Sequence, residues 1–300
     1  MPPQIRWFKS TDYGPLADLV KATRVPPWEG FGESMGITPE ALAEEFALFG
    51  EDPGERVLVA EEAAGLSGFC LLDPKTSELA VRLTGPVVHP EVRRRGIGMA
   101  LFRQAAHEAS HRYKPRILRN VVGEKNAGAR ALLEHNGFTP TKRSIIYQLP
   151  IPGEIRVLRR PDAEVQTLSP DLFDEAVRLI RSEFPGTWKD RAQFQREFRH
   201  PECLNLVLIR NGEMVGFLSS IKDEEGDAWL EYMVIRDAER RGGFGKMLLS
   251  EILNQSRQRW GVKHAGLSVR ADNVPAIQMY ERFGFVAQGG VVVYEKRLEA

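Results

Sequence analysis

Apolar and polar positions recur with two different periods along the second half of the chain. Apolar side chains three or four residues apart predict helices over 171–184, 190–198, 244–253 and 275–282. Period-two alternation predicts strands over 154–160, 204–209, 213–219, 228–236 and 265–270, and a terminal strand pair over 285–297 that is broken at Gly289-Gly290. Asn211-Gly212 separates two of these strands, and this dipeptide is typical of a type I′ hairpin turn.

The first half of the chain repeats this order of elements. The same patterns predict strands over 55–62, 66–73, 80–88, 117–122 and 143–149, and helices over 96–113 and 127–136. Because hairpins alternate with helices, a sheet built only from βαβ units is excluded. We therefore expect an α/β chain with an α+β mixed sheet in each half.

An internal repeat explains why the two halves match. The offset is 147 residues (240 minus 93) for three matches, 93–98 with 240–245, Asn126 with Asn273 and 137–138 with 284–285. Upstream, 68–69 match 216–217 at an offset of 148, and Ile5-Arg6 match Ile155-Arg156 at an offset of 150. We predict two tandem domains, 1–150 and 151–300, joined by a short connector rich in proline and glycine over 149–153.

Charge and cysteine content narrow the function classes. Lys and Arg total 41 and Asp and Glu total 41, so no net field attracts nucleic acid or an anionic membrane. Two cysteines are too few for a disulfide framework, and no apolar segment approaches the roughly 20 residues that span a bilayer. We expect a cytoplasmic protein that binds neither nucleic acid nor membrane and holds no metal, while the oligomeric state stays open.

The repeated glycine-rich segment is the main candidate for ligand binding. It lies between an apolar strand and an amphipathic helix, where consecutive backbone N–H groups converge on one point and bind anions. Glycine permits the backbone angles and the close approach, and Arg240, Arg241 and Lys246 add positive charge. The alternative is a basic surface turn, but the recurrence of the segment favours an anion site. It matches neither a Walker loop nor a dinucleotide fingerprint.

The two segments resemble the R/Q-x-x-G-x-G/A loop of the GNAT superfamily of N-acetyltransferases. Arg93-x-x-Gly96-x-Gly98 and Arg240-x-x-Gly243-x-Gly245 carry the resemblance, together with the downstream Asn-x-x-Ala and Gly-Phe elements. The resemblance implies a mostly antiparallel twisted sheet in each domain, and acetyl-CoA as co-substrate. Two such domains in one chain are similar to the tandem form of the mycothiol synthase family, in which the C-terminal copy is active.

The resemblance also implies which residues bind the coenzyme. The backbone from Arg241 to Lys246 would hold the pyrophosphate, and Met233 and Ile235 would contact the acetyl carbonyl and the pantetheine arm. The full set of implied binding residues is Met233, Val234, Ile235, Arg240, Arg241, Gly242, Gly243, Phe244, Gly245, Lys246 and Asn273, with Val88, Arg93, Arg94, Arg95, Gly96, Ile97 and Gly98 in the first half.

Two side chains are candidates for proton transfer. Strand alternation places Glu231 on the face of Trp229 and Met233, where it could deprotonate an acceptor amine, although the usual family carboxylate position corresponds to Trp229. Tyr280 lies seven residues after Asn273 on a helix, and the family places a general-acid tyrosine at this motif position. The alternatives are a solvated strand carboxylate for Glu231 and a core tyrosine for Tyr280.

The first half lacks both of these side chains. An offset of 147 gives Thr84 for Glu231 and Leu133 for Tyr280. We therefore expect acetyl transfer in the C-terminal domain, to a small-molecule amine or alternatively to a peptide or protein. Phe184 and Trp188 either wall the acceptor pocket or pack the helices. The rival function is a non-catalytic acyl-CoA-binding or regulatory protein.

Overall fold

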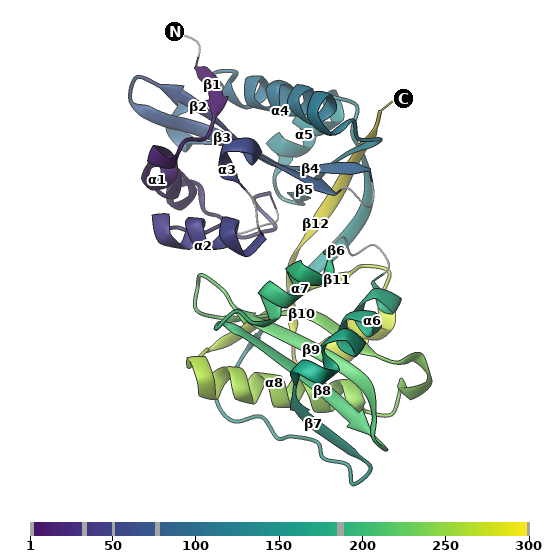
Figure 1. Cartoon of the computed structure of the whole chain (residues 1–300). Helices are drawn as coiled ribbons and strands as arrows, with labels where there is room; N and C mark the ends of the chain where they lie inside the picture. Colours follow the sequence, from purple (N-terminus) through teal and green to yellow (C-terminus); the bar gives the residue numbers. More distant parts are fainter. Residues whose placement is uncertain (1–2, 32–34, 50–51, 76–78, 185–188, 299–300) are drawn as a thin grey trace. The chain divides into compact units, whose positions relative to one another are not determined.

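The chain forms two compact units, each with a mixed α/β architecture (Figure 1). The computed structural model describes residues 3–31, 35–49, 52–75, 79–184 and 189–298. Unit 1 runs to Ser144 and includes the C-terminal residues from Gly289 onward, and unit 2 comprises Ile145–Gln288. In the described residues no helix is both long and apolar enough to cross a membrane.

Unit 1 is a sheet with helices on both faces. Its strands follow the order β1 (Gln4–Trp7), β2 (Val57–Glu62), β3 (Gly65–Lys75), β4 (Ala80–Val88), β5 (Ile117–Gly123) and β12 (Val286–Arg297). Its helices are α1 (Tyr13–Thr23), α2 (Pro39–Phe49), the one-turn α3 (Pro53–Arg56), α4 (Ile97–Tyr113) and α5 (Ala127–His135). One core forms between the sheet and α1 with α2, and a second between the sheet and α4 with α5.

Unit 2 repeats this arrangement. Its strands follow the order β7 (Ala163–Thr167), β8 (Cys203–Arg210), β9 (Glu213–Lys222), β10 (Ala228–Ile235), β11 (His264–Arg270) and β6 (Thr139–Pro150). Its helices are α6 (Phe173–Glu183), α7 (Arg191–Phe198), α8 (Phe244–Trp260) and α9 (Val274–Phe283). The core under α8 and α9 and the core under α6 and α7 lie on opposite faces of the sheet.

Each sheet opens between its two parallel strands. In unit 1, β4 pairs with β5 only from Ala80 to Arg82, and in unit 2, β10 pairs with β11 only from Ala228 to Leu230. Beyond these residues the paired strands separate, and a register shift marks the same position in both units. One turn of 3₁₀ helix, Pro90–Val92 after β4 and Asp237–Glu239 after β10, leads from each strand to its glycine-rich segment, so each segment lies near the end of such an opening.

The last strand of each half completes the sheet of the other half's unit. Tyr147 on β6 is buried in unit 2, where its hydroxyl donates to Oε1 of Glu281 at 2.8 Å. Tyr294 on β12 is buried in unit 1, where its hydroxyl donates to Oε1 of Glu134 at 2.9 Å. These residues correspond in the repeat, since 294 minus 147 and 281 minus 134 are both 147. The same tyrosine–glutamate hydrogen bond therefore occurs in both units, and in each unit the tyrosine lies on the strand contributed by the other half of the chain.

The structural units therefore differ from the sequence halves 1–150 and 151–300. Residues 145–150 belong to unit 2, and the strand from Gly289 belongs to unit 1. The segment 285–297 is not a broken strand pair but contains one strand, β12, which runs straight through Gly289-Gly290. A single strand that crosses between units replaces the hairpin that the glycines suggested.

Most other predicted elements are confirmed, with one clear error. Asn211 and Gly212 have φ values of 51° and 83°, as a type I′ turn requires. The predicted strand over 154–160 is wrong, because the side chain of Asn254 satisfies both Ile155 N–H (2.8 Å) and Ile155 C=O (2.7 Å) in place of a neighbouring strand. The edge strand β7 begins at Ala163 instead, so Ile155 is not the structural equivalent of Ile5 on β1.

Candidate functional site

The two glycine-rich loops have the same backbone conformation. Arg94 and Gly96 have φ values of 63° and 83°, and Arg241 and Gly243 have φ values of 65° and 83°. Gly96 and Gly243 are the N-caps of α4 and α8 and lie in the left-handed region, which glycine adopts without a Cβ penalty. The first N–H groups of each helix lack intrahelical acceptors and point into the loop, so both loops are built to bind an anion.

The first arginine of each loop stabilises this conformation. Nε of Arg93 donates to the carbonyl of Val88 at 3.0 Å, and Nε of Arg240 donates to the carbonyl of Ile235 at 3.2 Å. In unit 2 the guanidinium of Arg240 also forms ion pairs with Glu183 and with Asp237, the latter at 2.5 Å. The residue equivalent to Asp237 in unit 1 is Pro90, so this second ion pair has no counterpart there.

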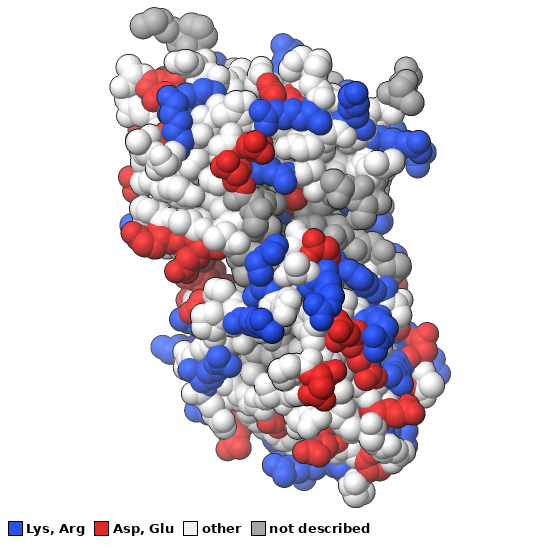
Figure 2. Space-filling model, in the orientation of Figure 1, with Lys and Arg blue, Asp and Glu red and all other residues white. Residues whose placement is uncertain are grey.

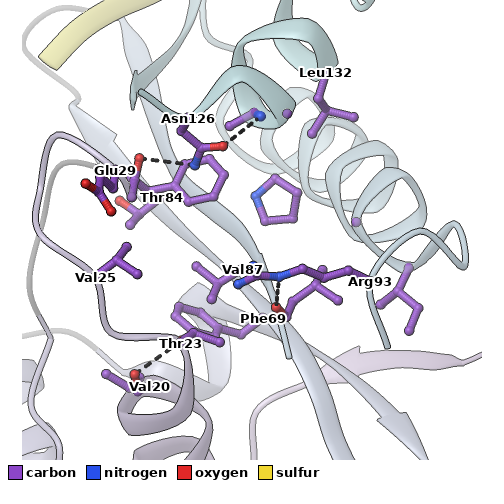
Figure 3. A pocket seen from close by; sticks show the side chains of 18 of the residues that line it. Val20, Thr23, Val25, Glu29, Phe69, Thr84, Val87, Arg93, Asn126 and Leu132 are labelled. Carbon is purple, nitrogen blue, oxygen red and sulfur yellow. Dashed lines mark hydrogen bonds between the residues drawn. The ribbon is translucent and has the colours of Figure 1, made fainter. Parts of the chain in front are cut away.

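In unit 1 a cavity of about 570 Å³ lies against the C-terminal part of β4, where this strand no longer pairs with β5 (Figure 3). The glycine-rich loop, with Arg93, Arg94 and Gly96, lines one end. Figure 3 shows Arg93 on one side of the cavity, and Val20 and Val25, from α1 and the segment that follows it, on the other. Asn126 and Leu132 of the α5 region close a further side. The cavity therefore connects the predicted anion site to a chamber under α1.

Methionine side chains lie close to the equivalent glycine of unit 2. A Cβ built on Gly245 would lie 3.0 Å from both Cε of Met233 and Sδ of Met279. A Cβ on Gly98, the equivalent in unit 1, would lie 3.5 Å from Val88 and 3.7 Å from Pro86, which are ordinary contacts. Two methionine side chains thus lie closer to Gly245 than any side chain lies to Gly98, and because methionine is flexible they can move when a ligand enters.

Tyr280 lies beside these methionines, on α9. Its side chain is buried, and its hydroxyl donates to Sδ of Met233 at 3.3 Å. Burial raises the pKa of the Tyr280 phenol above its usual value. The hydroxyl therefore stays protonated and can donate a hydrogen bond to a group that replaces the Met233 sulfur.

The raised pKa of Tyr280 predicts how activity depends on pH. An exposed phenol with a pKa of about 10 is half ionised at pH 10. We expect no loss of kcat from Tyr280 ionisation up to about pH 10, measured at saturating amine and acetyl-CoA. Because the folded state holds this proton more tightly, its contribution to folding stability is present below pH ~10 and is lost at higher pH. A tyrosine-dependent fall in kcat centred near pH 9 would contradict the burial.

Glu231 lies on the other face of β10 from Met233. The register shift between Leu230 and Met233 interrupts the alternation, so Tyr232 packs with the α6 and α7 core while Met233 packs with the α8 and α9 core. Because Leu230 also faces α8, Glu231 faces α6 and α7. The predicted common face of Glu231 and Met233 is wrong, because a bulge adds one residue to the strand.

The surroundings of Glu231 are charged and aromatic. Glu231 interacts with Lys189, whose pKa is raised by nearby carboxylates, chiefly Glu197, against the opposing effect of burial. The Lys189 ammonium forms an ion pair with Glu197 in which both side chains are largely buried. Phe184 packs edge-on against Tyr232 with ring centroids 5.8 Å apart, so it walls this side of β10. Trp188, the other predicted acceptor residue, lies outside the described residues.

The two asparagines of the repeat are helix caps. Oδ1 of Asn126 accepts from the N–H of Ala129 at 3.0 Å, and Oδ1 of Asn273 accepts from the N–H of Ala276 at 3.3 Å. Asn126 also lines the unit 1 cavity, so capping fixes its side chain at the cavity wall. Within the described part of the chain, no three metal-ligating side chains cluster.

Comparison with protein families matches each of the two units to an acetyltransferase family. The acetyltransferase (GNAT) family matches residues 173–285, and an acetyltransferase (GNAT) domain matches residues 53–140. A mycothiol acetyltransferase of Streptomyces avermitilis is 27% identical over 272 residues, which cover 82% of this chain and 81% of that protein.

Two solved structures share the fold over nearly the whole chain. A GCN5-related N-acetyltransferase from Sphaerobacter thermophilus has a TM-score of 0.78 at 21% identity and covers 99% of this chain and 96% of its own. A tandem GNAT protein from the clavulanic acid biosynthesis pathway has a TM-score of 0.76 at 17% identity and covers 99% of both chains.

Proposed function

Because this chain belongs to the GNAT family of acetyltransferases, we propose that it transfers the acetyl group of acetyl-CoA to the amine of a small molecule. The mycothiol acetyltransferase relative supports a small-molecule acceptor. On the face shown in Figure 2, basic and acidic side chains are mixed on each unit. This mixture fits the zero formal net charge, and the face shown gives no support to a charged protein as the substrate.

Unit 2 carries the chemistry in this proposal. The observation that carries it is the buried Tyr280 hydroxyl, which donates to Sδ of Met233 on β10, and Met233 in turn lies against Gly245 of the loop that would hold the pyrophosphate. A pantetheine arm that runs from this loop into the opening displaces Met233 and meets the Tyr280 hydroxyl. The equivalent side chain in unit 1, Leu133, can donate no hydrogen bond.

The reaction is a direct attack of the amine on the thioester. An alkyl amine with a pKa of ~10.4 costs about 5 kcal/mol to deprotonate at pH 7, so a nearby base accelerates the attack. The amine approaches from the α6 and α7 face of β10, where Glu231 takes its proton as the C–N bond forms, and the C–S bond then breaks to release the thiolate toward Tyr280. Tyr280 stabilises this thiolate by a hydrogen bond, since a phenol with a raised pKa does not yield its proton to a thiolate of pKa ~8.5 outright.

One observation favours a second role for unit 1. It has the same loop conformation and an open cavity, but Thr84 and Leu133 replace the two proton-handling side chains. We therefore propose that unit 1 binds a CoA thioester without transferring its acyl group. Unit 2 would then account for all of the turnover.

Titration of the full-length protein with acetyl-CoA tests both assignments. We expect two binding events per chain by calorimetry. A Cβ in the left-handed region costs about 1–2 kcal/mol and distorts the loop, so Gly243→Val should remove one event together with thiol release. Gly96→Val should remove the other event and leave thiol release intact. Full turnover in Gly243→Val with both events retained would contradict the proposal.

A further inference from the structure

We propose that unit 1 is a binding site for CoA thioesters whose acyl chains are longer than acetyl, and that the chamber under α1 holds the acyl chain. This inference rests on the proposed use of CoA thioesters, but not on which unit catalyses. Three observations support it. The cavity is lined by apolar side chains at the end away from the glycine-rich loop, the wall at this end is anchored to β5, and unit 1 has Thr84 and Leu133 in place of the two proton-handling side chains.

The walls of this chamber are apolar. Five of the cavity-lining side chains belong to it, and we call them the acyl chamber: Val20, Val25, Met35, Phe69 and Val87. Val20, Met35 and Phe69 are buried in the core between the sheet and α1 with α2, and Val87 packs against that core. Figure 3 shows Val87 and Phe69 between Arg93 on one side and Val20 on the other. An acyl chain that extends from the glycine-rich loop into this chamber therefore contacts apolar side chains.

The polar groups near the acyl chamber have partners within the protein. The Thr23 hydroxyl donates to the carbonyl of Leu19 at 2.8 Å, and Arg24 and Thr84 also have interaction partners. Glu29 lies at the surface end of the cavity, 3.6 Å from Nζ of Lys125. No unmet hydrogen bond among these residues would need a polar ligand, whereas an apolar ligand gains the free energy of leaving water.

The segment after α1, which forms one wall of the cavity, is anchored to β5 and to the residues that follow it. The N–H of Gly123 donates to the carbonyl of Gly30 at 2.9 Å, and the N–H of Lys125 donates to the carbonyl of Trp28 at 2.9 Å. A Cβ on Gly123 would lie 2.2 Å from the backbone of Trp28, so this approach requires glycine. The Trp28 side chain also packs closely on Gly289. The chamber is thus a built feature of unit 1, with a wall held on β5 and β12.

The chemistry of unit 1 fits retention of a ligand better than its turnover. An acceptor amine in the acyl chamber would find Thr84 in place of a carboxylate, and the leaving sulfur would find Leu133 in place of a phenol. An acyl chain in the chamber would also exclude the acceptor from the thioester. Both effects keep the thioester intact while it is bound to unit 1.

Binding of CoA thioethers of increasing length tests this inference. Thioethers cannot transfer an acyl group, so S-ethyl-, S-butyl- and S-hexyl-CoA can be titrated into the full-length protein without any reaction. Each buried methylene corresponds to about a fourfold gain in affinity. We expect one of two binding events to tighten at least tenfold from S-ethyl- to S-hexyl-CoA.

Two matched tryptophan variants assign that event to unit 1. Val25→Trp places an indole in the acyl chamber at a position that is 46% exposed, and it should abolish the dependence on chain length. Val286→Trp, at a 60% exposed position outside the cavity, should retain it. Thermal unfolding of both variants confirms that each is folded.

The outcomes separate this inference from the proposed function. Equal affinity for the three thioethers, or a chain-length dependence that persists in Val25→Trp, would overturn the acyl chamber, while acetyl transfer by unit 2 would still stand. A protein that binds neither the thioethers nor acetyl-CoA would overturn both.

Discussion

Replacement of Tyr280 by phenylalanine is expected to lower kcat by about 100-fold, the lower end of the range for one acid–base group. In the proposed reaction the phenol donates a hydrogen bond to the leaving thiolate, and phenylalanine keeps the ring but not the hydroxyl. KM for acetyl-CoA should change little, because the substitution removes an interaction that forms as the C–S bond breaks. Stopped-flow measurement of thiol release at saturating amine gives both constants.

Tyr294→Phe is the matched control for this variant. Tyr294 is also a buried tyrosine with a hydroxyl partner, Glu134, but it lies in unit 1 on the exchanged strand β12. Its loss should lower the free energy of unfolding by about 1 kcal/mol without a hundredfold effect on kcat. If both variants lower kcat equally, the effect of Tyr280→Phe is structural and its catalytic assignment fails.

The second prediction with a large expected effect concerns which fragments of the chain can fold on their own. A fragment of residues 151–300 should fail to fold as a stable monomer, whereas a fragment of residues 145–288 should fold. The first fragment lacks the part of β6 that carries Tyr147 and Leu149, which are 2% and 8% exposed in the core of unit 2. Burial of each such side chain contributes about 1.5–3 kcal/mol, and the total stability of a domain is only about 5–15 kcal/mol.

Circular dichroism and size-exclusion chromatography distinguish the two fragments. Fragment 145–288 should show a cooperative thermal transition at a monomer volume. Fragment 151–300 should show no such transition, or should elute as an assembly in which its own β12 is donated to another copy. Equally cooperative monomers would show that the exchanged strands contribute little to stability.

The repeat and its loops could be predicted from the sequence because they are local. Glycine at 96 and 243 is required by the left-handed backbone angle at each helix start, and the spacing of apolar residues follows the helix that comes next. The Asn211-Gly212 turn is local in the same sense. Each of these features depends on residues only a few positions apart, so a single sequence contains the whole cause.

The predictions that were wrong concern features that depend on residues far apart in the sequence. The strand predicted over 154–160 failed because Asn254, some 99 residues away, satisfies the backbone of Ile155. The face of Glu231 was wrong because a bulge is defined by pairing with β9, which strand alternation cannot register. The acyl chamber under α1 was not predicted, because it combines residues from α1, β3 and β4 that are far apart in the sequence.

The sequence by itself determined that this protein has two copies of one glycine-rich loop, and that Thr84 and Leu133 stand in the first half where the second half has Glu231 and Tyr280. The tertiary structure alone decided which strand completes which unit, that unit 1 holds a cavity beside its loop, and that Met233 and Met279 lie against Gly245 in unit 2. The physical reason is range: backbone angles and helix starts depend on neighbours in the chain, whereas strand partners and cavities depend on side chains that only folding brings together.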